Sequence, residues 1–97
     1  MTVRFLEVAQ GELDEAIAYY NSQVPGLGDA YLLEAVAALE RIRRFPEAWQ
    51  PLGEQVRRCR LRRFPYGLIY AIDAGDILII AVAHTHRRPD YWRDRMK

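Results

Sequence analysis

The run from Ile77 to Val82 constrains the fold of this chain more than any other segment. All six residues are apolar. Successive side chains of a strand point to opposite faces, so a strand over Asp76–His84 would be apolar on both faces. Such a strand is expected to lie inside its sheet and to be covered on both sides. With only 97 residues, the chain should form one domain, 1–97, with little material for two covering layers.

Two helices are predicted upstream of this strand. Over Gln10–Gln23 apolar residues recur at helical spacing, and acidic residues gather near the amino-terminal end, where the helix dipole favours them. The second helix is predicted over Leu27–Arg44 and is stopped by Pro46. The short turn at Pro25-Gly26 makes the pair an antiparallel hairpin. The predicted buried stripes are Leu13, Ala16, Ile17 and Tyr20, and then Tyr31, Leu32, Ala35, Val36, Leu39 and Ile42.

Alternating apolar and polar residues indicate the other strands. Ala74-Gly75 provides a tight turn that makes the last two strands a hairpin. The predicted order is β-α-α-β-β-β, an α+β fold in which the helical hairpin packs on one face of a small, mainly antiparallel sheet. For the other face the chain offers a short tail or helix, Pro89–Lys97, and this shortfall suggests a partner segment. The predicted strands are Val3–Val8, Val56–Arg63, Tyr66–Asp73 and Asp76–His84.

Charge is divided unevenly along the chain. Residues 1–56 carry four arginines against nine acidic residues, whereas residues 57–97 carry nine arginines and Lys97 against four acidic residues. The basic part needs an acidic peptide or nucleic acid as partner, unless the acidic part of the same fold neutralises it. Alternation places Arg58, Arg60 and Arg62 on one face of their strand. Arginine binds carboxylate and phosphate through paired hydrogen bonds, so this face is a candidate anion-binding surface; the alternative is a solvated edge strand protected by charge.

A second basic group follows the last predicted strand. His84, Arg87 and Arg88 precede Tyr91 and Trp92, and cations beside aromatic rings can bind phosphate and stack on a base. For Trp92, burial over the core is the favoured role.

Other kinds of site find little support. His84 and His86 share a face, but no clustered cysteine or further histidine supplies more ligands, so neither a metal nor another cofactor is expected. Cys59 is the single cysteine, which excludes an internal disulfide and fits a reducing compartment. No apolar run approaches the roughly 20 residues that span a bilayer, and the first residues lack a signal-peptide pattern. A cytoplasmic protein is expected.

Three segments resemble the RelE/ParE family of bacterial type II toxins, known also as plasmid stabilisation proteins. They are Arg63–Tyr70, Ile79–His84 and Arg87–Trp92, and the helical hairpin adds Tyr19-Tyr20, Pro25–Gly28 and Pro46. The resemblance covers nearly the whole chain. It implies a toxin that a cognate antitoxin neutralises. The uneven charge and the under-covered sheet suggest that the antitoxin binds through an acidic, amphipathic carboxy-terminal segment, whose carboxylates would meet Arg58, Arg60 and Arg62.

The family divides by activity. RelE-like members cleave messenger RNA on the ribosome, whereas ParE-like members inhibit DNA gyrase without established nuclease chemistry. Where the ribonuclease branch commonly has a catalytic arginine, this chain has Gly67, and Lys97 is its only lysine.

The resemblance therefore favours a non-catalytic, ParE-like gyrase inhibitor, with Arg87, Arg88, Tyr91 and Trp92 as candidate target-binding residues. A ribonuclease would depend on Glu54 or His84 as base and on Arg63 or Arg87 for the phosphate. A non-toxic module that only binds an antitoxin is the third possibility.

Overall fold

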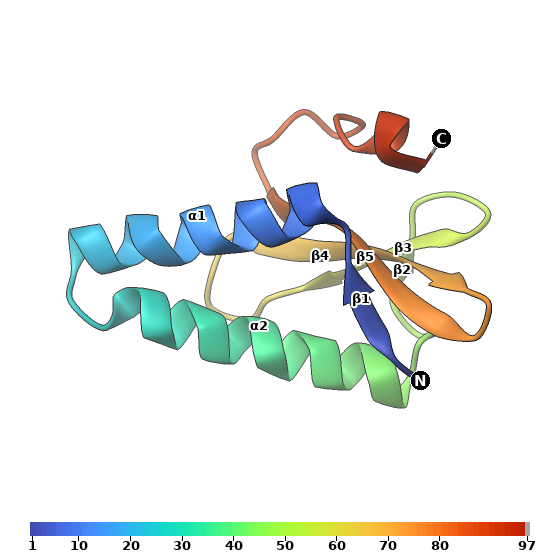
Figure 1. Ribbon diagram of the computed structural model, residues 1–97, viewed down its shortest axis with the longest axis horizontal. Coiled ribbons are helices and arrows are strands. Elements are labelled where there is room, and N and C mark those ends of the chain that lie inside the picture. Colours follow the sequence, from blue (N-terminus) through green and yellow to red (C-terminus); the bar gives the residue numbers. More distant parts are fainter. Residues whose placement is uncertain (97) are drawn as a thin grey trace.

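The structure is a computed structural model that describes residues 1–96, and it confirms the predicted α+β fold. Figure 1 shows the two long helices lying antiparallel alongside the sheet. Within residues 1–96 the sheet has five strands, in the order β1-β5-β4-β3-β2. Lys97, the last residue of the predicted tail, lies outside the described residues. The elements are β1 Val3–Phe5, α1 Glu7–Gln23, α2 Leu27–Arg44, β2 Gln50–Pro51, β3 Val56–Arg60, β4 Tyr66–Asp73, β5 Asp76–His84 and the 3-10 helix η1 Arg93–Met96.

Strand β5 lies inside the sheet, as its two-sided apolar run predicts. It pairs in parallel with β1 on one side and antiparallel with β4 on the other. A register shift in the β4–β5 pairing leaves Ile80 between two paired residues, and such a bulge resets the alternation of faces. As a result Ile79 and Val82 belong to the core beneath the helices, whereas Ile80 and Ala81 pack on the opposite face.

Close packing of the helical hairpin depends on two glycines. Gly26 has φ +88°, a left-handed conformation that few other residues tolerate. Gly28 lies where the helices approach each other, because a Cβ on it would overlap the carbonyl oxygen of Ile17 and the side chain of Asn21. The Gly28 N–H also donates to Asn21 Oδ1 at 2.7 Å. The turn and the first residues of α2 therefore set the helix spacing.

Two predicted strands end earlier than expected. β1 stops at Phe5, so the prediction of a strand over Val3–Val8 is wrong beyond that residue. The Leu6 N–H donates to Ile79, still in the sheet pattern, while the Leu6 carbonyl accepts from Gln10 and begins α1. β3 ends at Arg60 rather than Arg63. A short alternation of apolar and polar residues indicates a strand, but it does not fix the residue at which the strand stops pairing with its neighbour.

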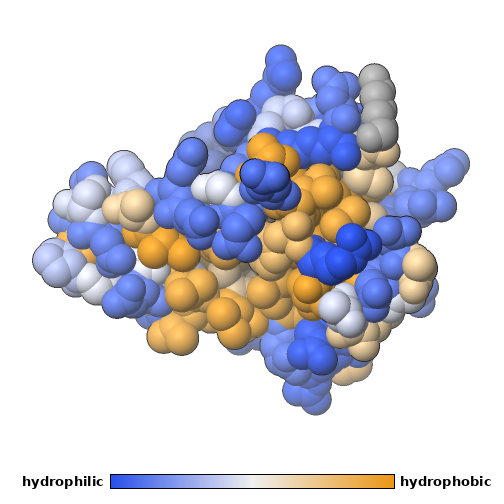
Figure 2. All heavy atoms as spheres, viewed as in Figure 1, coloured by the Kyte–Doolittle hydropathy of each residue, from blue (hydrophilic) through white to orange (hydrophobic). Residues whose placement is uncertain are grey.

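The buried stripe of α2 differs in part from the prediction. Leu32 and Val36 were expected inside but are 39% and 51% exposed, and Leu39 is half-buried against the core. The buried stripe is narrower than predicted because α2 contacts α1 and the sheet along a single line of residues. Each next residue of a helix is rotated by about 100°, so the positions beside this line face solvent. Figure 2 shows the resulting apolar surface along the α2 side of this view. The fully buried residues of the stripe are Tyr31, Ala35, Ala38 and Ile42.

The face of the sheet opposite the helices is covered by the chain's own tail. Trp92 is 1% exposed and packs with apolar residues of β3, β4 and β5, among them Val56, Ile69 and Ile80. The predicted role of Trp92 as a cover of the core is confirmed. The Trp92 indole covers only part of this face of the sheet. The position of the tail therefore decides which side chains on the rest of the face are accessible to a partner.

Candidate functional site

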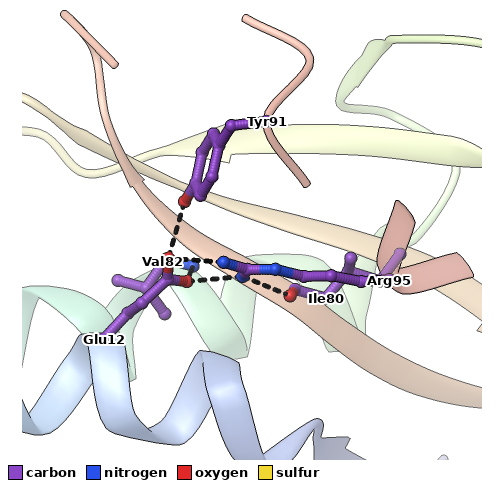
Figure 3. Close-up of polar contacts among 5 residues, drawn as sticks. All are labelled: Glu12, Ile80, Val82, Tyr91 and Arg95. Carbon is purple, nitrogen blue, oxygen red and sulfur yellow. Dashed lines mark hydrogen bonds and ion pairs between the residues drawn. The ribbon is translucent and has the colours of Figure 1, made fainter. Parts of the chain in front are cut away.

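Glu12 of α1 holds the tail against the sheet. Figure 3 shows side chains from α1 and the tail meeting at its carboxylate beside β5. Glu12 Oε1 accepts hydrogen bonds from the Val82 N–H at 3.0 Å and from Arg95 Nη1 at 2.8 Å. Glu12 Oε2 accepts from Arg95 Nη2 and from the Tyr91 hydroxyl, both at 2.9 Å. Arg95 Nη1 also donates to the Ile80 carbonyl at 3.1 Å. Three elements are thus joined at one carboxylate.

The electrostatics of this cluster match its geometry. Burial by itself raises the pKa of Glu12, but the hydrogen bonds from Arg95, Val82 and Tyr91 outweigh it, and the pKa lies below the usual value. The hydrogen bond to Glu12 raises the pKa of Arg95 in turn. The side chains of Glu12 and Arg95 are 15% and 16% exposed, so water screens the pair weakly. No pattern in the sequence predicts this cluster; its one local signal is an acidic residue beside the apolar stripe of α1.

Arg58, Arg60 and Arg62 do come together, but in unequal surroundings. All three line a groove of about 360 Å³ beside Arg41 and Trp49. Arg60 and Arg62 are exposed, whereas Arg58 is partly buried. The geometry is compatible with a basic surface for a partner; which partner binds there remains a prediction.

Arg58 lies across the sheet because Gly67 leaves room for it. A Cβ on Gly67 would stand 3.0 Å from both Cγ and Cδ of Arg58, tighter than ordinary contact. Arg58 Nη2 donates to Gln50 Oε1 at 2.8 Å. Burial, and then repulsion by Arg60, lower the pKa of Arg58. The glycine at the position of the ribonuclease arginine therefore has a structural role of its own in this chain.

The four candidate ribonuclease residues do not converge. His84 and Arg87 line one hollow of about 240 Å³, together with Glu12, Glu15, Tyr19 and Tyr66 of neighbouring elements. Glu54 lines a different hollow, near the end of the sheet where Val56 pairs with Ala71, whereas His84 pairs with Tyr66 at the other end of β4. Arg63 pairs with Glu34 of α2 at 3.4 Å. A ribonuclease needs a base and a phosphate-binding arginine within reach of one reacting group. Of the four candidates, only His84 and Arg87 line the same hollow.

The candidate target-binding residues are divided between surface and core. Arg87 and Arg88 are exposed. The Arg87 guanidinium lies 4.1 Å from the centre of the Tyr91 ring, and that of Arg95 lies 4.9 Å from it. Trp92 is buried, so it offers no exposed ring in this arrangement of the tail. The role of these four residues in target binding stays a prediction.

Neither a metal-binding cluster nor a membrane-spanning helix is found in the described part of the chain. Among residues 1–96, no group of three or more His, Cys, Asp and Glu side chains is placed to hold a metal ion. No helix in this range is both long and apolar enough to cross a membrane.

The fold and the site define a small α+β domain with a helical hairpin on one face of a mixed sheet and arginines on the other. The sequence model described as "ParE toxin of type II toxin-antitoxin system, parDE" matches residues 3–89. The chain therefore belongs to the ParE toxin family. A solved structure titled "Chromosomal ParDE TA system from P. aeruginosa" has the same fold, with a TM-score of 0.76 at 17% identity, covering 87% of this chain and 95% of that one. No curated protein matches the sequence.

Proposed function

We propose that this chain is a toxin that inhibits DNA gyrase by binding it, without catalysis, in the bacterial cytoplasm. The observation that carries the proposal is the contact between Gly67 and Arg58. A Cβ at position 67 would stand 3.0 Å from the stem of Arg58, so Arg58 occupies the space over Gly67, and the chain has no arginine at the position that the ribonuclease branch uses. Glu54 and Arg87 line different hollows, so of the two candidate bases only His84 lies beside the candidate phosphate-binding arginine Arg87.

Inducing the chain alone in bacteria tests this proposal. Gyrase inhibition predicts DNA breaks and an SOS response, with full-length message remaining. The purified chain should also block supercoiling by gyrase in the test tube. Arg87→Ala and Arg88→Ala should reduce both effects, because these exposed arginines are the candidate contacts. Arg43→Ala serves as a matched control, because Arg43 is an exposed arginine of α2 that pairs with Glu40.

A RelE-like ribonuclease remains the alternative because His84 and Arg87 share a hollow with Tyr19 and Tyr66. On programmed ribosomes a gyrase inhibitor leaves the codon in the A site uncut. Codon-specific cleavage that disappears in His84→Ala would overturn the gyrase proposal and establish the ribonuclease. A chain that causes neither effect, yet binds an antitoxin, would be the non-toxic module.

A cognate antitoxin is the second part of the proposal. The match to the ParE family and the "ParDE" structure support it. Its acidic, amphipathic carboxy-terminal segment would place carboxylates along the groove lined by Arg58, Arg60 and Arg62. The apolar side chains of the segment would bind beside the helical hairpin, where Leu32 and Val36 of α2 are exposed.

A further inference from the structure

A small pocket lies between the sheet and the start of the tail. Arg58 and Ile69 line it from β3 and β4, and Ala83 from β5, while Arg87, Arg88, Tyr91 and Trp92 close it from the tail. Its volume is about 60 Å³, and since one water occupies about 30 Å³ in the liquid, it admits a single small group. We call this hollow the tail pocket.

Two buried hydrogen-bond donors belong to the side chains that line the tail pocket. Arg58 Nε and Trp92 Nε1 are both inaccessible to solvent and have no hydrogen-bond partner within residues 1–96. Burying a donor without an acceptor costs stability, so most buried donors in folded proteins are satisfied. Both donors belong to side chains in the wall of the tail pocket, so an acceptor group that enters the pocket can satisfy them once these side chains shift to admit it.

The charge around the tail pocket indicates the sign of that group. Arg58, Arg87 and Arg88 line it, and no carboxylate of the described residues does. Two acidic side chains of the adjoining elements are engaged elsewhere: Glu12 binds Arg95, and Asp90 binds Arg93 at 2.9 Å. A guanidinium that is partly buried among like charges is stabilised by an anion that accepts its hydrogen bonds.

We propose that the tail pocket binds one carboxylate, supplied by the acidic segment of the antitoxin. The inference rests on the proposed partner. It assigns to Arg58 a role that Arg60 and Arg62 do not share, because neither of them lines the tail pocket. A carboxylate has two acceptor oxygens, enough for Arg58 Nε and Trp92 Nε1 together. Gly67 is a positioning residue, because its lack of a side chain lets Arg58 lie over the sheet. Binding there would also hold the tail in place through Trp92.

The test follows the indole N–H of Trp92 by NMR on the intact chain, with acetate as the probe and chloride at equal ionic strength as the control. Trp49→Phe removes the other tryptophan signal and so assigns the resonance. Acetate should shift the Trp92 N–H signal saturably, while chloride should not. Arg58→Lys keeps the charge but lacks Nε, and should weaken acetate binding about tenfold or more. Gly67→Ala should weaken it less, and Arg43→Gln, on α2, should leave it unchanged.

The complex with the cognate antitoxin supplies the second arm. The antitoxin should shift the same Trp92 signal as acetate does, and Arg58→Lys should lose affinity while Arg62→Lys keeps it. If the antitoxin binds tightly but the Trp92 signal does not move, this inference is wrong while the proposed partner stands. If no antitoxin binds, the proposed function fails first. A saturable shift with inorganic phosphate but none with acetate would overturn the carboxylate assignment in favour of a nucleic-acid phosphate.

Discussion

Removing the Glu12 carboxylate should destabilise the whole domain and release its tail. In Glu12→Ala, the Val82 N–H, the Tyr91 hydroxyl and Arg95 Nη2 lose their acceptor, and Arg95 Nη1 keeps only the Ile80 carbonyl. Breaking a buried ion pair by removing one partner costs about 3–5 kcal/mol. Because the side chains of Glu12 and Arg95 are about 15% exposed, we expect somewhat less, about 2–4 kcal/mol. Glu12→Gln keeps an acceptor oxygen and should cost only about 1–2 kcal/mol.

Urea melts of the parent and the two variants measure these losses, and fluorescence of Trp92 in a Trp49→Phe background reports the tail separately. In Glu12→Ala, Trp92 fluorescence should show the tail leaving the sheet at a lower urea concentration than the one at which circular dichroism shows the helices unfolding. A loss in Glu12→Ala below about 0.5 kcal/mol, with Trp92 still buried, would refute the reasoning, because it would mean that solvent satisfies these groups equally well.

The lowered pKa of Glu12 adds a pH dependence to the same prediction. A carboxyl group whose pKa is lower in the folded chain binds its proton more readily when unfolded. Its stabilising effect is therefore complete above its ordinary pKa of 4.5 and is lost as the pH falls through the lower folded value. The difference in stability between the parent and Glu12→Gln should be constant near neutral pH and shrink below about pH 4.5. A difference that persists unchanged to pH 2 would contradict an ionic role for Glu12.

Further predictions concern packing and the partner surface. Ile42→Ala should cost about 2–5 kcal/mol in denaturant melts, and Leu39→Ala clearly less, because Ile42 is fully buried and Leu39 is not; equal losses would contradict the observed phase of α2. Gly28→Ala should lower the melting temperature by several degrees, because the new Cβ overlaps α1; an unchanged melting temperature would mean that the helices separate at no cost. Replacing Arg58 and Arg60 together by Glu should weaken antitoxin binding strongly in titration calorimetry, and charge reversal on the antitoxin should recover part of the loss; unchanged affinity would assign these arginines to the target instead.

Local pattern was sufficient for much of this fold. The helical spacing of apolar residues and the turn at Pro25-Gly26 predicted the hairpin, because two helices joined by so short a connection must pack antiparallel against each other. The apolar run over Ile77–Val82 predicted an internal strand, since only burial on both faces accommodates it. These features depend on residues close together in the chain.

What the sequence could not provide depends on contacts between distant residues. Periodicity shows that α2 has an apolar face, but the line of contact with α1 and the sheet left Leu32 and Val36 outside. The joining of Glu12 to Arg95, 83 residues apart, needs the tail to cross the sheet. Likewise, alternation put Arg58 and Arg62 on one face as equals. The tertiary structure separates them, because Arg58 lies over Gly67 of the neighbouring strand and lines the tail pocket, whereas Arg62 does not line it. Pairing partners across a sheet and the path of a tail are decided by packing of the whole chain, and no local pattern encodes them.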